Sequence, residues 1–415
     1  MPRLVMKFGG TSVGDLDRIR NVALHVKREL EAGFEVAVVV SAMSGETNRL
    51  VGLARGLSSL HDAREYDTIV AAGEQISVGL LAIALQDIGV SARSWLGWQL
   101  PILTDDAHGS ARIADIDVDK MEEQFRQGRV AVVAGFQGVS PEGRIATLGR
   151  GGSDTSAVAL AAALKADRCD IYTDVDGVYT TDPRIVPEAR KLDRVSYEEM
   201  LEMASSGAKV LQTRSAELAM VHSVKLQVRS SFDAPDAEFP EDGLVGTLIC
   251  SEEEIMEQEV VSGVAYTRNE AKITLRDVTD QPGVAAQVFG TLADGSVNVD
   301  MIVQNVSTDG LKTDLTFTVA NDDLDRTMLL IDGAKERLNF DAVEQKSAMA
   351  KISIVGIGMR SHAGVAQKMF KVLAEKGINI HVISTSEIKI SVLIDDEYTE
   401  LAVRALHAAF GLDNL

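Results

Sequence analysis

The chain has 415 residues, of which 46% are hydrophobic and 25% are charged, so it is long enough for two to four domains with substantial buried cores. Its formal net charge is −21 and it has no basic block, which argues against nucleic acid or an anionic membrane surface as a partner. The two cysteines, Cys169 and Cys250, have no partner at metal-ligand spacing, which argues against a disulfide framework or a structural zinc site. The opening "MPRLVMKFGG" is not a signal peptide, and the apolar runs fall far below the roughly 20 residues of a membrane span. We therefore expect a soluble, cytoplasmic protein.

The first 230 residues alternate short β-branched runs with longer segments of helical spacing. The predicted strands are residues 3–8, 35–43, 92–103, 129–136, 168–175 and 224–231. The predicted helices are residues 17–33, 64–89, 117–128, 154–166, 196–203 and 210–222. Because the strands are apolar on both faces, they suit a mostly parallel sheet covered by helices. The prediction is one α/β domain of 230 to 245 residues.

The remaining chain begins with a segment that reads as a linker or long loop and then contains an internal repeat. Residues 233–246, "DAPDAEFPEDGLVG", are rich in proline, glycine and acid, and a charged run follows. Residues 281–302 can be laid over residues 362–383 at a constant offset of 81, as from Gly283 to Gly364. Each copy reads as βαββ with room for a last helix and strand, which predicts two small ferredoxin-like units. A duplicated module without catalytic-looking residues more often senses a ligand or forms an interface.

The motif "MKFGGTSVGD" places Lys7 just ahead of Gly9 and Gly10 at the end of the first predicted strand. Glycines at a strand-to-helix turn expose backbone N–H groups, and the following helix adds its positive N-terminal end. A lysine is costly there unless an anion is bound. The P-loop pattern and the protein-kinase elements are absent, so a phosphate site would belong to another nucleotide-binding fold. The alternative is a tight turn beside a surface lysine.

Two further stretches of the sequence contain candidate ligand-binding residues. In "TLGRGGSDTSAVALAAALKA", Ser153, Asp154 and Thr155 are predicted to cap an alanine-rich helix, but capping does not explain Arg150 between glycines. A cation, bare N–H groups and a carboxylate at a helix start suit an anionic substrate that meets a phosphate. In "YTDVDGVYTTDPR", an EF-hand would need glycine and glutamate where Tyr179 and Ile185 stand, so calcium is not expected. A nucleotide-contacting loop after a strand fits better.

Five segments, "KFGGTSVG", "VVVSAMSGETNRL", "AAGEQIS", "TLGRGGSDTSA" and "YTDVDGVYTTDPR", together resemble the aspartate kinases of the amino-acid kinase superfamily. The paired repeat resembles the two regulatory ACT domains of that family, and the resemblance covers essentially the whole chain. It implies a three-layer αβα catalytic domain with a mostly parallel sheet at residues 1–245, a linker and first ferredoxin-like ACT domain at 246–345, and a second at 346–415.

The implied activity is ATP-dependent phosphorylation of the side-chain carboxylate of L-aspartate to 4-phospho-L-aspartate, the first step towards lysine, threonine and methionine. The nucleophile is already ionised at neutral pH, so positioning and cations suffice and no general base is required. Mg²⁺ is expected to arrive with ATP, because the chain shows no dedicated protein cage for a metal.

The resemblance also assigns residues to the nucleotide. Lys7 and the N–H groups of Gly9 and Gly10 would hold the β- and γ-phosphates of ATP. Asp154 would orient Lys7 and Lys209, and these three form the implied catalytic set. Adenosine and phosphates would be contacted by Thr173, Asp174, Tyr179, Arg184 and Lys209.

A second implied set binds aspartate. Glu74 would receive the α-amino group, and Arg150 would clamp the α-carboxylate, for which its planar fork is suited. The rest of the substrate site would be lined by Ser41, Thr47, Gly152 and Ser153.

The ACT repeats imply feedback inhibition by lysine, threonine or both. The matching effector positions are Asp280, Gln281, Gly283, Asn298 and Gln304 in the first repeat, with Ser361, Asn379 and Ile380 in the second. Such sites commonly form across a dimer, so we expect a homodimer, or an α2β2 assembly with a shorter regulatory chain that starts at Met256.

Two other functions stay open at this point. The chain could be an amino-acid-sensing subunit whose kinase-like domain is only a scaffold, although the presence of Lys7, Arg150, Asp154 and Lys209 counts against this. It could also be a kinase of a different carboxylate, such as glutamate. The ACT pair and the "GETNRL" and "GEQIS" loops favour aspartate.

Overall fold

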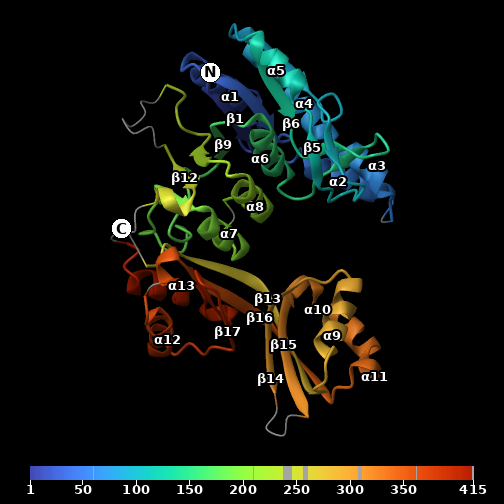
Figure 1. The fold of residues 1–415 in the computed structure, drawn as a ribbon, viewed down its shortest axis with the longest axis vertical. Coiled ribbons are helices and arrows are strands. Elements are labelled where there is room, and N and C mark those ends of the chain that lie inside the picture. The colour runs from blue at the N-terminus through green and yellow to red at the C-terminus, as the bar shows by residue number, and fades with distance from the viewer. Residues whose placement is uncertain are drawn as a thin grey trace. The chain divides into compact units, whose positions relative to one another are not determined.

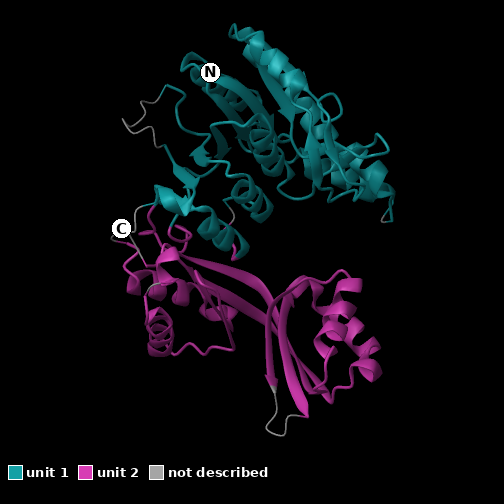
Figure 2. Ribbon diagram, in the orientation of Figure 1, with its two compact units in different colours: residues 1–179, 191–205, 209–257 teal, residues 180–190, 206–208, 258–415 magenta. Residues whose placement is uncertain are grey.

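The computed structural model describes residues 1–58, 60–208, 210–236, 245–255, 260–306, 311–360 and 362–413. The chain forms two compact units, shown in different colours in Figure 2. Unit 1 comprises Met1–Tyr179, Lys191–Ser205 and Lys209–Glu257. Unit 2 comprises Thr180–Arg190, Ser206–Ala208 and Gln258–Leu415.

Unit 1 is built on an eight-stranded sheet with the order β10-β12-β11-β9-β1-β2-β6-β3 (Figure 1). Its strands are β1 (Arg3–Phe8), β2 (Glu35–Val40), β3 (Ala92–Trp95), β6 (Val130–Ala134), β9 (Arg168–Thr173), β10 (Arg194–Ser196), β11 (Leu226–Ser230) and β12 (Thr247–Cys250). Every neighbouring pair is parallel except β11 with β12. The predicted mostly parallel α/β domain is confirmed.

Helices cover both faces of this sheet. On one face, α1 (Leu16–Glu31) and α4 (Ala72–Asp87) share a core with Leu4, Met6 and Phe8 of β1. On the other face, α6 (Gly152–Leu164) packs against β1 and β2, and α8 (Thr213–His222) packs against α6. Because side chains alternate along a strand, Lys7 points towards α6, away from the α1–α4 core.

A smaller sheet of unit 1 has the order β5-β4-β7-β8. Its strands are β4 (Ile102–Thr104), β5 (Ile113–Ile116), β7 (Gln137–Val139) and β8 (Ile145–Thr147). This sheet was not predicted, and the single strand expected at residues 92–103 is wrong. That segment turns and splits into β3 and β4, which belong to different sheets. Short strands of three or four residues leave too little periodicity to read from the sequence.

The helices of unit 1 differ from expectation in two places. The predicted helix at residues 64–89 is divided at Ala71 into α3 (Ala63–Val70) and α4. One helix, α2 (Glu46–Leu57), was not predicted, whereas α5 (Asp119–Arg126) and α7 (Tyr197–Ser205) match predicted segments. The stretch Ala63–Asp87 is long and apolar enough, by length and composition alone, to cross a membrane, and half of its apolar 18-residue window is buried within the fold.

Unit 2 contains a six-stranded antiparallel sheet with the order β14-β15-β13-β16-β18-β17 (Figure 1). The strands are β13 (Gly263–Thr279), β14 (Val299–Val306), β15 (Lys312–Ala320), β16 (Ala342–Val355), β17 (Val382–Thr385) and β18 (Lys389–Asp395). The helices are α9 (Val284–Asp294), α10 (Leu324–Gly333), α11 (Lys335–Leu338), α12 (Val365–Glu375) and α13 (Thr399–Ala409).

The internal repeat is confirmed by matching backbone conformations. Gly283 and Gly364 are the N-caps of α9 and α12, with φ of 97° and 96°. Ser296 and Gly377, which are also 81 residues apart, both have positive φ after those helices. Left-handed backbone favours glycine, so the first repeat accepts strain at Ser296.

The two modules share their longest strands, which differs from two successive βαββαβ units. The first part of β13 pairs with the last part of β16, as Gly263 with Val355 and Thr267 with Lys351. Among the described residues no strand follows α13, so the start of β13 takes the place beside β16 where the fourth and last strand of the second module was expected. The predicted boundary at residues 345/346 therefore falls inside β16.

Part of the predicted catalytic region packs within unit 2. The Thr180 carbonyl accepts a hydrogen bond from the Val264 amide at 2.7 Å, and the Thr180 hydroxyl lies 2.9 Å from His407 Nε2. Arg404 donates to the Ile185 carbonyl at 2.9 Å. The predicted catalytic domain at residues 1–245 is thus not one continuous structural piece. The unit 1 sheet also continues past that boundary, because β12 lies beyond residue 245.

A buried histidine makes the stability of unit 1 depend on pH. His25 in α1 is 1% exposed and lies beside the stacked rings of Phe8 and Tyr172. Burial, together with the nearby Arg28 and Arg229, lowers its pKa from 6.5 to about 4. His25 is therefore protonated less readily in the folded protein than in the unfolded chain. Its contribution to the free energy of unfolding is present above pH 6.5 and is lost as the pH falls towards 4.

We expect unit 1 to lose about 2 kcal/mol of unfolding free energy from this group between pH 7 and pH 5. Both tryptophans, Trp95 and Trp98, lie in unit 1, so tryptophan fluorescence during urea unfolding reports on it. The variant His25→Gln cannot titrate and should lose less stability over this range. Parallel pH profiles for the two proteins would contradict the assignment.

Candidate active site

Four parallel strands of unit 1 end at one edge of the sheet. Phe8 of β1 lies in register with Val40 of β2 and Tyr172 of β9, and Val40 with Ala134 of β6. Backbone hydrogen bonds continue past the strand ends, from the Gly9 amide to the Tyr172 carbonyl at 3.2 Å. The loops "KFGG", "SAMSG" and "TDVD" therefore begin side by side at the carboxyl edge, where open α/β sheets bind their ligands.

Lys7 and Asp154 form a buried ion pair at this edge. Lys7 is 7% exposed and Asp154 9%. The Lys7 ammonium also lies 3.5 Å from the position that a Cβ at Gly9 would occupy, so it sits directly over the glycine turn. Asp154 compensates the lysine charge and holds it in place, which a buried cation requires.

The start of α6 corrects the capping prediction. Its N-cap is Gly151, with φ of 70°, and no side chain caps the helix. Asp154 pairs with Lys7 instead, and the Thr155 hydroxyl donates to the Gly151 carbonyl at 3.2 Å. An N-terminus that lacks a side-chain cap presents N–H groups and a positive dipole end to an anion.

Close approaches between the loops require glycine. A Cβ at Gly10 would lie 3.0 Å from the Ala42 carbonyl oxygen, so the loops after β1 and β2 touch. A Cβ at Gly135, after β6, would lie 2.8 Å from the Ser153 hydroxyl. Ser153 is thereby packed against this edge, 7% exposed.

Glu74 is a buried carboxylate that forms no ion pair with any of the residues described. It lies in the first turn of α4 and is 3% exposed. One oxygen accepts a hydrogen bond from the Ala42 amide at 3.0 Å, whereas the other has no hydrogen-bond partner in the described part of the chain. Burial raises the pKa of Glu74 to about 7. A ligand cation at the free oxygen would supply both the missing hydrogen bond and the missing charge.

Other residues predicted to bind substrate or nucleotide differ in how exposed their side chains are. Arg150 is exposed and forms no ion pair among the residues described. Ser41 and Thr47 are half-buried. At the end of β9 the Thr173 hydroxyl donates to Asp174 at 3.2 Å.

The structure describes Tyr179 and Arg184 among the remaining predicted nucleotide residues. The Tyr179 hydroxyl donates to Asp176 at 2.9 Å. Arg184 belongs to unit 2, where it pairs with Asp182 at 2.7 Å and lowers the pKa of that carboxyl to about 2. Lys209 lies outside the described residues, and so does Met256.

One residue near the site was not predicted. Arg214 of α8 donates to the carbonyl oxygens of Leu148 and Ala111, both at 2.9 Å, and so supports the loop that leads to Arg150. Burial lowers the pKa of its guanidinium. Nothing near Arg214 in the sequence marks this role, because its partners are 66 and 103 residues away.

The predicted effector residues of unit 2 lie in the turn before α9, in or next to β14, and shortly before β17. Asp280, Gln281 and Gly283 lie between β13 and α9, and Asn298 directly precedes β14. Gln304 lies within β14, and Asn379 and Ile380 precede β17. Ser361 lies outside the described residues.

Comparison with known families agrees with both units. The model of the amino acid kinase family matches residues 2–230. An ACT domain model matches residues 276–334 and 352–410. The chain is also 54% identical over 414 residues to an aspartate kinase of Pseudomonas putida, covering 100% of this chain and 98% of that protein. The chain belongs to the aspartate kinases of the amino acid kinase family.

More distant members share the sequence and the fold. An aspartokinase of Helicobacter pylori is 50% identical over 414 residues, with 99% of each chain covered. The crystal structure of E. coli aspartokinase III with aspartate and ADP, in its R-state, has a TM-score of 0.82 at 27% identity, covering 98% of this chain and 99% of that chain. The same enzyme with lysine and aspartate, in its T-state, has a TM-score of 0.74 at 28% identity and covers the same shares. As an aspartate kinase, this chain is an enzyme of the phosphotransferase class.

We expect Lys7→Ala to fold but to lose nearly all turnover, because the cation at the glycine turn is gone. The change also leaves Asp154 without its partner, so some loss of stability is expected, and circular dichroism should establish that the variant is folded. Lys27→Ala removes an exposed lysine of α1 and is the matched control. Turnover by folded Lys7→Ala close to that of the control would refute the site.

Proposed function

We propose that this chain transfers the γ-phosphoryl group of MgATP to the side-chain carboxylate of L-aspartate. A carboxylate oxygen attacks the γ-phosphorus, the bond from that phosphorus to the β-phosphate oxygen breaks, and ADP leaves with 4-phospho-L-aspartate as the product. No proton is transferred, since the nucleophile is ionised at neutral pH. Catalysis then depends on alignment and on cations that balance the developing charge.

The observation that carries this proposal is the unequal state of two buried charges at one edge of the sheet. Lys7 is already neutralised by Asp154 and overlies the glycine turn, which suits a phosphate that brings its own negative charge. Glu74 has a free buried oxygen, which suits an ammonium group. Their loops touch where Gly10 meets Ala42, so a phosphate and an amino acid would meet between them.

The other roles follow the same pattern. Gly9, Gly10 and the uncapped start of α6 would hold phosphate oxygens, and exposed Arg150 is free to clamp the α-carboxylate. Ser41, Thr47, Gly152 and Ser153 would line the aspartate site, and Thr173, Asp174, Tyr179, Arg184 and Lys209 would contact the nucleotide. The E. coli enzyme that was crystallised with aspartate and ADP supports this choice of ligands.

Unit 2 would provide feedback control by lysine, threonine or both. The lysine-bound T-state of the E. coli enzyme supports lysine as one effector. Because each ACT module presents its turn and strand start at matching positions, we expect effector sites formed across a homodimer or an α2β2 assembly with a shorter regulatory chain. The enzyme would act in the cytoplasm.

The direct test is acyl-phosphate formation from MgATP, trapped as the hydroxamate, with aspartate and glutamate as rival substrates. Each reaction is run without effector, with lysine, with threonine and with both. Product from aspartate, reduced by lysine or threonine, is the expected result.

Two other outcomes distinguish the alternatives. Product from glutamate in preference to aspartate would assign a different substrate. Binding of lysine or threonine without any acyl phosphate would make the chain a sensing subunit.

The free carboxylate of Glu74 predicts a pH dependence. Only its ionised form pairs with an ammonium group, so kcat/KM for aspartate should rise about tenfold per pH unit below its pKa of about 7 and level off above it. Glu74→Gln should lower kcat/KM roughly 10- to 100-fold and remove this rise. Exposed Glu31→Gln is the control. A Glu74→Gln profile that keeps the wild-type inflection would assign the titration to another group.

A further inference from the structure

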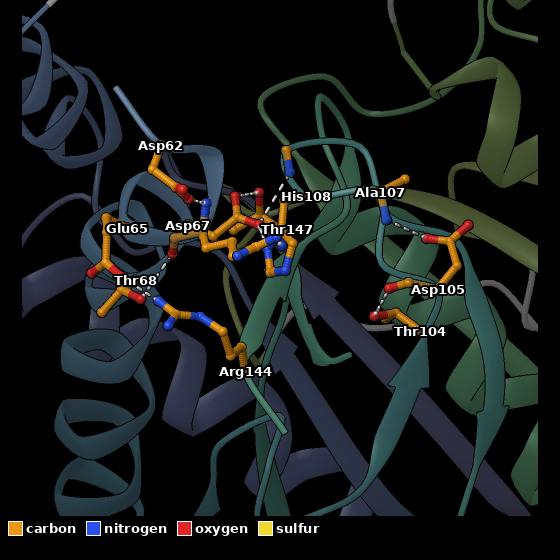
Figure 3. Close-up of polar contacts among 12 residues, drawn as sticks. Asp62, Glu65, Asp67, Thr68, Thr104, Asp105, Ala107, His108, Arg144 and Thr147 are labelled. Atoms are coloured by element: carbon orange, nitrogen blue, oxygen red, sulfur yellow. Dashed lines mark hydrogen bonds and ion pairs between the residues drawn. The ribbon is translucent and has the colours of Figure 1, made fainter. Parts of the chain in front are cut away.

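Asp67 of α3 is a fully buried carboxylate that accepts four hydrogen bonds from other segments (Figure 3). Thr147 donates twice, from its amide at 3.0 Å and from its hydroxyl at 2.5 Å. The Gly109 amide donates at 3.1 Å, and His108 Nδ1 lies at 2.8 Å. Every donor is at least 41 residues away in sequence, so this carboxylate holds together three segments of unit 1.

The Thr147 side of this cluster leads directly to the predicted clamp for the substrate carboxylate. Thr147 is the last residue of β8, and Arg150 follows three residues later in the glycine-rich loop. Gly109 backs the same loop, because a Cβ at Gly149 would lie 3.2 Å from the Gly109 carbonyl oxygen. Asp67 thus fixes the backbone at the base of a loop whose Arg150 side chain is exposed.

The helix side of the cluster leads to the predicted ammonium site. From Asp67 the chain runs through Ala71 into α4, whose first turn carries Glu74. The Ala71 amide donates to the Asp67 carbonyl at 3.0 Å, and Gln137 donates to the Ala71 carbonyl at 3.1 Å. Glu74 is therefore attached to Asp67 through a short helical junction that these two hydrogen bonds hold.

We infer that Asp67 is a positioning residue for the amino-acid substrate. Its bonds to Thr147 set the spacing between Glu74, which would take the α-amino group, and Arg150, which would take the α-carboxylate. Those two groups are attached to the same carbon of any α-amino acid, so the two receptors must stand at one fixed separation. This inference rests on the proposed function and deepens it, because it concerns aspartate and not the nucleotide.

The chemistry of the Asp67 cluster favours a role in fixing the position of Thr147 over a role in stability alone. An apolar side chain in a buried position contributes to stability at least as well as a buried charge does. The Asp67 carboxylate accepts hydrogen bonds from both the amide and the hydroxyl of Thr147. Because both bonds form at once, they fix the position and orientation of Thr147 relative to Asp67. A shift of about 1 Å in a substrate-binding group is enough to cost a large factor in rate.

The test uses Thr147, which carries the hydroxyl but has no proposed contact with substrate. Thr147→Val removes the hydroxyl at nearly constant volume, and Thr147→Ser keeps it. Glu199→Gln is the matched control, because Glu199 is also a buried carboxylate in unit 1 and accepts bonds from the Ser196 amide and hydroxyl, at 3.1 and 3.0 Å. Steady-state constants for aspartate and for MgATP are measured separately, with a thermal unfolding midpoint for the wild type and for each variant.

We expect Thr147→Val to raise KM for aspartate about tenfold while KM for MgATP changes less than about twofold. Thr147→Ser should stay within about twofold of the wild type for both substrates. The protection that aspartate gives against thermal unfolding should weaken in Thr147→Val and remain in Thr147→Ser. Asp67→Asn, which keeps the shape but disturbs the donors, should shift the same constant in the same direction.

Two results would overturn the inference while leaving the proposed function intact. One is an unchanged KM for aspartate in folded Thr147→Val. The other is an equal rise in both KM values, or the same rise in Glu199→Gln, which would mean a general loss of stability. Failure of the wild type to form acyl phosphate from aspartate would instead overturn the proposed function itself.

Discussion

A lysine at the end of a buried central strand needs a partner, and the catalytic unit is arranged around that need. Lys7 follows three fully buried residues of β1 and points to the face where α6 lies. Asp154 in the first turn of α6 supplies the compensating charge, so this helix must begin beside the carboxyl end of β1. The glycine-rich loop that precedes α6 is thereby brought to the same edge. One ion pair places the cation, an uncapped helix start and the Arg150 loop together.

Glu74 differs from Lys7 because no ion pair neutralises its charge among the residues described. This difference underlies the two roles proposed for these residues. Its carboxylate is as buried as Lys7, yet in the described part of the chain it accepts from backbone amides, such as that of Ala42, and forms no ion pair. Burial raises its pKa to about 7, so near neutral pH the carboxyl is only partly ionised, and a bound cation would favour its charged form. The site thus contains one charge that is neutralised by the fold and one that waits for a ligand. In the proposed reaction, the first would serve the phosphate and the second would serve the amino acid.

The boundary between the two units does not follow the sequence. The chain leaves the sheet of unit 1 after Thr173, and Thr180–Arg190 already packs within unit 2 against Val264, Arg404 and His407. The modules of unit 2 likewise share β13 and β16 instead of dividing the chain between them. A strand contributes hydrogen bonds on both edges, so a long strand can complete a module that lies elsewhere in the chain order. Domain limits drawn from motifs and linkers therefore miss segments that pack with a different part of the chain and strands that two modules share.

The sequence by itself determined what depends on neighbours along the chain. The alternation of apolar runs and helical spacing predicted the mostly parallel sheet, the offset of 81 predicted the repeat, and the glycine-rich motifs predicted which loops reach the carboxyl edge. Only the tertiary structure decided which distant groups meet, such as Asp67 with Thr147, Arg214 with Leu148, or the start of β13 with the end of β16. Such contacts leave no local periodicity, because they arise from the packing of whole elements and not from the residues beside them.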